Sequence, residues 1–180
     1  MADIVSAWID CQREITDGMP VLDQLAHLHA NVRAVIRYEQ QALDDSWQLP
    51  HETLGKFAGN CNDMAGLWYF TLGHLLPLDD WQDGVRMIQV RLHGLPRGRD
   101  GHMVCGVVID GETWVLDNRA AAIYRLADEN RQQTLVAQSS ASHFRMGRDI
   151  VPVKYDRFDA YLLALSEYPN SEHFAPELGG

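Results

Sequence analysis

Three residues have side chains suited to nucleophilic catalysis: Cys61, His102 and Asp117. A thiolate is a strong nucleophile, an imidazole can take up and return a proton, and a carboxylate can hold the imidazole in one orientation. Along the chain, 41 positions separate Cys61 from His102 and 15 separate His102 from Asp117. The three can act together only if the elements around them bring them to one place.

His102 and Asp117 lie on a predicted β-hairpin. Apolar residues crowd into 102–109 and 113–117, and the Asp-Gly dipeptide at 110–111 suits a tight turn. A two-residue turn places His102 one diagonal step from Asp117 on the same face, because strand side chains alternate. The register therefore predicts an imidazole beside a carboxylate. Taken alone, a histidine and an aspartate at strand ends are also ordinary turn-flanking residues.

Cys61 is the first residue of a predicted helix. Gly59 breaks the preceding element, Asn60 is a good N-cap, and Asp63 places an acid in the first turn. Apolar residues at helical spacing continue to position 75, so we expect a buried helix. A helix N-terminus offers free N–H groups that favour a thiolate and can hold an oxyanion. The plain alternative is an inert thiol at a helix start.

The elements expected around these residues define an α+β fold. Helical patterns cover 21–41, 50–57, 61–75 and 158–165, and strand patterns cover 85–92, the hairpin, 120–126 and 134–138. We expect the cysteine helix to pack on an antiparallel sheet. A chain of 180 residues with 46% hydrophobic and 22% charged residues predicts a single domain over 1–180, with its core at 21–166 and a loose tail at 167–180.

Charge and cysteine usage narrow the function classes. The net charge of −10 argues against a nucleic-acid binder. The acidic N-terminus has no signal-peptide pattern and no apolar run predicts membrane insertion, so we expect a cytoplasmic protein as written, or a periplasmic one if a leader was trimmed. Cys11 and Cys105 have no base placed beside them, and the cysteines form no disulfide framework or zinc pattern.

Two stretches resemble a known family. GNCNDMAGLWYFTLGHL is similar to the GDCEDYA-type cysteine helix of the bacterial transglutaminase-like cysteine proteinases, which include the LapG-like enzymes. GHMVCGVVIDGETWVLDN is similar to their HMVL…VLDN hairpin. The spacings agree with that family, and the tryptophan and proline ahead of the cysteine recur, so the resemblance covers about residues 25–155.

The resemblance implies a papain-like, transglutaminase-type core and a cysteine endopeptidase that cleaves a protein or peptide substrate through an acyl-enzyme. Cys61 would be the nucleophile, His102 the general base and then acid, and Asp117 the orienting residue. The oxyanion would be held by the N–H of Cys61 and one side-chain donor. By analogy with related folds, Trp47 is the first candidate and Gln48 the second.

The resemblance also bears on calcium. The LapG-like enzymes are periplasmic, bind calcium next to the cysteine and release large surface adhesins. Here Asn60 and Asn62 stand where that family has acids, and only Asp63 keeps a carboxylate. Calcium prefers several hard oxygen ligands that include carboxylates. These three residues are therefore weak calcium candidates, and Asn60 and Asp63 are better explained as helix caps. We expect no required cofactor.

Two other functions use the same residues. An amine could take the acyl group in place of water, which would make the protein a transglutaminase or amidase on the same triad. A catalytically inactive member of the fold could instead bind a protein partner, and the two asparagines beside Cys61 favour that alternative. The sequence leaves the substrate, the cleavage motif and the oligomeric state open.

Overall fold

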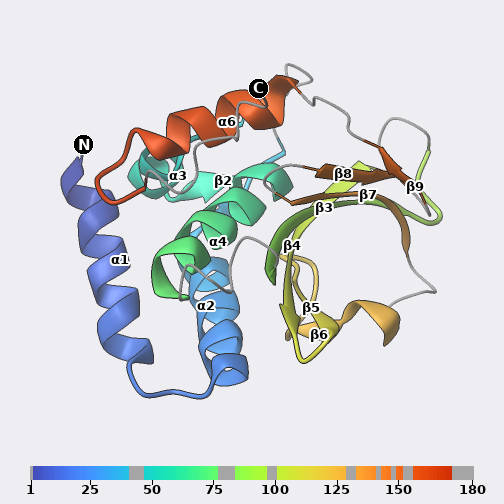
Figure 1. The fold of residues 1–180 in the computed structure, drawn as a ribbon. Coiled ribbons are helices and arrows are strands. Elements are labelled where there is room, and N and C mark those ends of the chain that lie inside the picture. The colour runs from blue at the N-terminus through green and yellow to red at the C-terminus, as the bar shows by residue number, and fades with distance from the viewer. Residues whose placement is uncertain are drawn as a thin grey trace.

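A group of helices packs against a curved antiparallel sheet (Figure 1). The structure, a computed structural model, describes residues 2–40, 47–76, 84–96, 101–128, 133–140, 143–146, 149–151 and 156–171. In chain order the elements are α1 (Ala2–Thr16), α2 (Val21–Val35), β1 (Arg37–Tyr38), α3 (Pro50–Lys56), β2 (Ala58–Gly59), α4 (Cys61–Leu75), β3 (Val85–Leu92), β4 (Gly101–Ile109), β5 (Glu112–Leu116), β6 (Tyr124–Arg125), the 3₁₀-helix η1 (Leu126–Asp128), β7 (Gln133–Ser140), β8 (His143–Met146), β9 (Asp149–Val151) and α6 (Asp156–Ser166).

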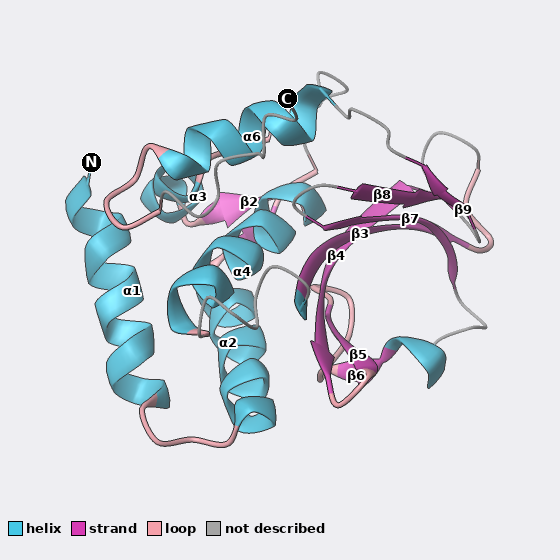
Figure 2. Cartoon of the chain, in the orientation of Figure 1, coloured by secondary structure: helices cyan, strands magenta, loops and turns pink. Residues whose placement is uncertain are grey.

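The main sheet contains the predicted hairpin. Its strand order is β6-β5-β4-β3-β7-β8-β9, with every neighbouring pair antiparallel (Figure 2). Ile109 pairs with Glu112 across a turn at Asp110 and Gly111, whose φ angles are 51° and 79°. Positive φ at both positions is what the favoured two-residue hairpin turn requires. The predicted register is therefore confirmed.

Helix α4 begins at Cys61, as predicted, and lies against β4 and β3. Asn60 caps it: its side chain accepts from the N–H groups of Asn62 and Asp63, and Asp63 returns a bond to the Asn60 N–H. Almost the whole helix from Asp63 to Gly73 is buried. The cap and the burial together hold the first turn of α4 in a fixed position.

The core is wider than the range 21–166 expected from the sequence. Helix α1 contributes Val5 and Ile9 to the main cluster, and beyond α6 Tyr168 packs against Phe70 while Ser171 is fully buried. Residues 172–180 of the predicted tail lie outside the described part.

Among the described residues, no helix has the length and apolar character needed to cross a membrane.

The helix expected over 21–41 is shorter in the structure. It ends at Val35, and Ile36 adopts an extended conformation with φ −95° and ψ 112°. The next residues form β1, which pairs in parallel with β2. Because this pairing joins segments about twenty positions apart, local periodicity could not indicate it. The ribbon β1–β2 leads the chain directly into Asn60 and Cys61.

Candidate active site

The hairpin brings His102 and Asp117 into contact. Nε2 of His102 lies 2.8 Å from Oδ1 of Asp117, and both residues are only 5% exposed. The carboxylate has further donors: the N–H of Arg119 at 2.8 Å from Oδ1 and the hydroxyl of Tyr124 at 3.2 Å from Oδ2. Burial opposes ionisation, but these bonds and the charge of His102 hold the pKa of Asp117 below its ordinary value. Asp117 is therefore a buried carboxylate that stays charged.

His102 also reaches Cys61. The Cys61 thiol lies within hydrogen-bonding reach of the imidazole, while Nε2 of the same ring bonds Asp117. Burial alone would lower the pKa of His102, but the hydrogen bonds and charges of Asp117 and Cys61 outweigh it and raise the pKa to about 9. At neutral pH the ring therefore carries a proton.

Cys61 is half-buried at the first position of α4. Its thiol donates a long hydrogen bond of 3.9 Å to Oδ1 of Asn62. The Asn60 cap uses the N–H groups of Asn62 and Asp63, and no described residue takes the N–H of Cys61. That N–H and the helix dipole are positioned to stabilise negative charge on an atom bound at Cys61.

The two residues predicted as oxyanion donors lie in different environments. Gln48, which is 8% exposed, donates from its backbone N–H to Oδ1 of Asp63 at 2.8 Å and from Nε2 to Oδ2 at 3.2 Å. Its Oε1 is buried with no partner among the described residues. Trp47 packs edge-on against Tyr161, with ring centroids 5.3 Å apart. Gln48 is thus tied to the cysteine turn through Asp63, whereas the described contacts of Trp47 are with the core.

Two of the three calcium candidates next to Cys61 have side-chain oxygens that already accept hydrogen bonds within the turn. Asn60 Oδ1 is occupied by two backbone N–H groups, and both oxygens of Asp63 accept hydrogen bonds from Gln48 and Asn60. Across the described ranges there is no group of three or more histidine, cysteine, aspartate or glutamate side chains placed to hold a metal. Calcium prefers several oxygen ligands with carboxylates among them, and Asp63 is the carboxylate that this turn contributes.

Cys105 is fully buried, and burial raises the pKa of its thiol, while Cys11 is exposed. Neither lies in the site.

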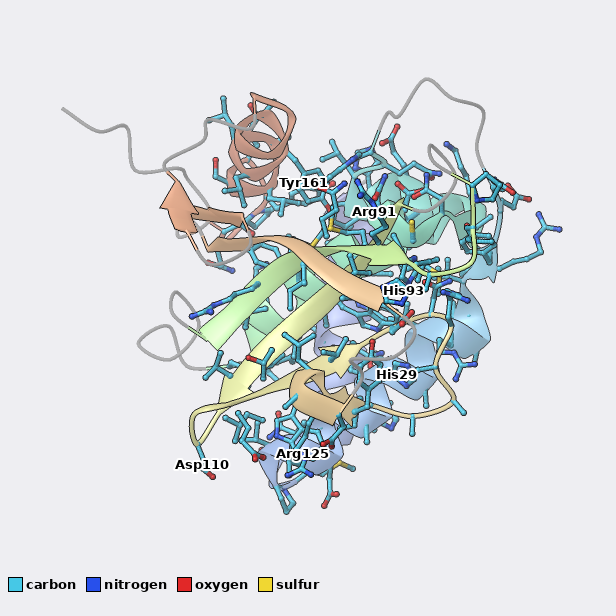
Figure 3. All side chains as sticks on the ribbon, turned by 90° about the vertical axis from the view of Figure 1, so that its right-hand side faces the viewer. His29, Arg91, His93, Asp110, Arg125 and Tyr161 are labelled. Carbon is cyan, nitrogen blue, oxygen red and sulfur yellow. The ribbon has the colours of Figure 1, made fainter. Side chains whose placement is uncertain are left out.

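Sequence analysis did not identify His29 of α2 as part of the site. Its Nε2 donates to the carbonyl of Asp117 at 2.9 Å, and its ring stacks on Trp68. Burial lowers the pKa of His29, consistent with a neutral ring that donates this bond. His29 lies where α2 meets the sheet (Figure 3), 88 positions from Asp117, so no local pattern could reveal it.

The fold and the site together define a class: α+β proteins in which a cysteine starts a buried helix packed on an antiparallel sheet that carries a histidine and an aspartate. LapG of Legionella pneumophila, a transglutaminase-like cysteine protease, has a similar structure. Calcium-bound LapG has a TM-score of 0.68 and 21% identity over 87% of this chain and 84% of that chain. The EGTA-treated form has a TM-score of 0.67 and 22% identity over 85% of this chain and 81% of that chain.

No protein-family model and no curated protein matches the sequence. At 21% to 22% identity, the similarity to LapG establishes the fold. The α+β transglutaminase-type fold expected from the sequence is confirmed.

Proposed function

We propose that this protein is a cysteine endopeptidase of the LapG-like family, with Cys61, His102 and Asp117 as its catalytic triad. The observation that supports this most strongly is the buried His102 ring, whose Nε2 lies 2.8 Å from Oδ1 of Asp117 and which lies within hydrogen-bonding reach of Cys61. Because Asp117 holds one side of the ring, His102 can give a proton to, or take one from, a group bound at Cys61. The similarity to LapG supports the same conclusion at the level of the fold.

In the first half-reaction the Cys61 thiolate attacks the carbonyl carbon of the scissile peptide bond. The carbonyl oxygen becomes an oxyanion, held by the N–H of Cys61, with Gln48 and Trp47 as the candidate side-chain donors. When the C–N bond breaks, His102 gives its proton to the leaving amine, and the substrate acyl group stays on Cys61 as a thioester. The pKa of His102, raised to about 9, means that this proton is present at neutral pH.

In the second half-reaction the neutral His102 takes a proton from water. The resulting hydroxide attacks the thioester carbon, the C–S bond breaks, and a carboxylic acid leaves. Asp117 keeps the ring in the orientation that serves both steps and stabilises its positive charge. If a primary amine replaces water in this step, the same triad forms an amide, which is the transglutaminase alternative.

The test is a digest of a mixture of unfolded proteins, with new termini identified by mass spectrometry. We expect the wild type to generate new N-termini that are absent with Cys61→Ala and strongly reduced with His102→Ala. A labelled primary amine added to the same digest separates the two acyl acceptors, because only amide formation incorporates the label. A wild-type digest identical to that of Cys61→Ala would contradict the proposal and favour a protein that only binds a partner.

A further inference from the structure

The ribbon β1–β2 brings the backbone of an exposed tyrosine close to the start of α4. Tyr38 pairs with Gly59, two positions before Cys61, in parallel register. Its side chain is 51% exposed, although it is one of the larger apolar groups of the chain. Tyr38 therefore forms part of the surface that a substrate meets when its scissile bond reaches Cys61.

The main chain of Tyr38 is also open to a partner. The ribbon uses the N–H of Arg37, which donates to Phe57 at 2.9 Å, and that of Glu39, which donates to Gly59 at 2.9 Å. In a parallel pair, successive residues direct their N–H and C=O groups to opposite sides. Those of Tyr38 thus point away from β2, and no described residue bonds them. An extended peptide can pair with such an edge through its own main chain.

A positively charged residue, Arg119, lies next to the proposed triad. The N–H of Arg119 bonds Asp117 Oδ1 at 2.8 Å, so this residue is fixed to the site through its backbone. Its side chain is exposed, and its guanidinium forms no ion pair with any residue in the described ranges. In contrast, Arg13, Arg37 and Arg125 each have a carboxylate partner. In a chain of net charge −10, an arginine without an ion-pair partner among the described residues is available to bind a negatively charged group.

The phenol of Tyr38 is influenced electrostatically by both Cys61 and Arg119. Burial raises the pKa of Tyr38, and its phenol responds to both neighbours: Cys61 raises the pKa further and Arg119 lowers it. The phenol therefore lies within electrostatic range of both groups. A peptide that crosses Cys61 and pairs with Tyr38 brings its side chains within reach of the guanidinium.

We propose that Tyr38 and Arg119 form a specificity subsite that takes an acidic side chain of an extended peptide substrate, which is bound through the main chain of Tyr38. Arginine suits this role because its planar fork binds a carboxylate through two hydrogen bonds. The inference rests on the proposed peptidase function and adds the substrate class to it.

The experiment measures residue frequencies around the cut sites in a digest of an unfolded proteome, for the wild type and for Arg119→Ala and Arg119→Glu. Arg13→Glu is the control, because it makes the same change of net charge at an exposed arginine of α1, a helix that lies across the molecule from β4 and β5 (Figure 1). In the wild type we expect aspartate and glutamate to be enriched at one position near the cut. Arg119→Ala abolishes this enrichment and Arg119→Glu replaces it with lysine and arginine.

Kinetics on a matched pair of peptides cut by the wild type, with glutamate or lysine at that position, give the size of the effect. Arg119→Glu should change the ratio of the two kcat/KM values by about tenfold or more in favour of lysine, and Arg13→Glu should leave the ratio unchanged. Cuts without acidic enrichment, or enrichment that survives Arg119→Glu, would overturn this inference alone. A wild type that produces no cuts beyond those of Cys61→Ala would overturn the peptidase function, and this inference with it.

Discussion

Asp117 is the residue through which several parts of the site are coupled. Its carboxylate accepts from His102, Arg119 and Tyr124, and its backbone carbonyl accepts from His29. Removing its negative charge while keeping its shape should therefore affect His102 more than it affects the fold.

We expect Asp117→Asn to reduce kcat/KM by about a hundredfold or more, because the ring loses its orienting partner. The same change should lower the pKa of His102 from about 9 towards its ordinary value, which NMR titration of the imidazole measures. The control is Tyr124→Phe, which removes the 3.2 Å bond to Oδ2 and should cost less than about tenfold. An unchanged His102 titration in Asp117→Asn would show that the pair does not set the charge of the ring.

The raised pKa of His102 also predicts how stability depends on pH. A group with a folded pKa of about 9 and an unfolded pKa of about 6.5 contributes stability that is complete below pH 6.5 and is lost as the pH rises through 9. The contribution is at most about 3 kcal/mol. Urea unfolding from neutral pH to about pH 10 should show this loss in the wild type and not in His102→Gln. Parallel stability curves for the two proteins would contradict it.

At the scale of elements, α4 depends on close packing with α6. A Cβ at Gly66 would lie 2.3 Å from the hydroxyl oxygen of Tyr161, which is buried and has no partner among the described residues. Gly66→Ala should lower the free energy of unfolding by about 1–3 kcal/mol through overpacking. Tyr161→Phe removes the obstructing oxygen at little cost of its own, so the double variant should recover part of the loss.

A double-mutant cycle in urea measures this coupling. Strictly additive effects would show that α6 does not hold α4 through this contact. The cycle tests the packing of α4 against α6 separately from catalysis, since neither Gly66 nor Tyr161 belongs to the proposed triad.

The elements that carry the site could be predicted where the signal was local. The Asp-Gly turn fixed the register of β4 and β5, and Asn60 with Asp63 marked the start of α4. The sequence did not reveal β1, whose parallel pairing with β2 is non-local. Nor did it reveal His29 or the exposure of Tyr38, because both depend on how α2 and its continuation lie against the rest of the fold.

At the level of the whole molecule, the fold is similar to that of LapG, and we expect the cysteine turn to bind calcium weakly or not at all. The oxygens of Asn60 and Asp63 are used by hydrogen bonds within the turn. We therefore expect calcium at about 100 times a typical sensor-site Kd to shift the Tm by less than about 1 °C, where a specific site would add about 2.7 kcal/mol. A rise of several degrees that EGTA reverses would contradict this. The double variant Asn60→Asp with Asn62→Glu, which carries the acids of the family pattern, is the comparison.

We propose that the fold assembles Cys61, His102 and Asp117 into an activated nucleophile. The most direct test is the rate of alkylation of each cysteine as a function of pH, followed by peptide mass spectrometry. Cys11 is an exposed thiol and Cys105 a buried one, so both serve as internal controls.

We predict that Cys61 reacts at about pH 6 at least about tenfold faster than Cys11, and that His102→Ala abolishes this advantage. Cys105 should stay unreactive in the native protein. If Cys61 and Cys11 follow the same pH dependence in the wild type and in His102→Ala, the three residues form no activated nucleophile and the proposed peptidase loses its mechanism.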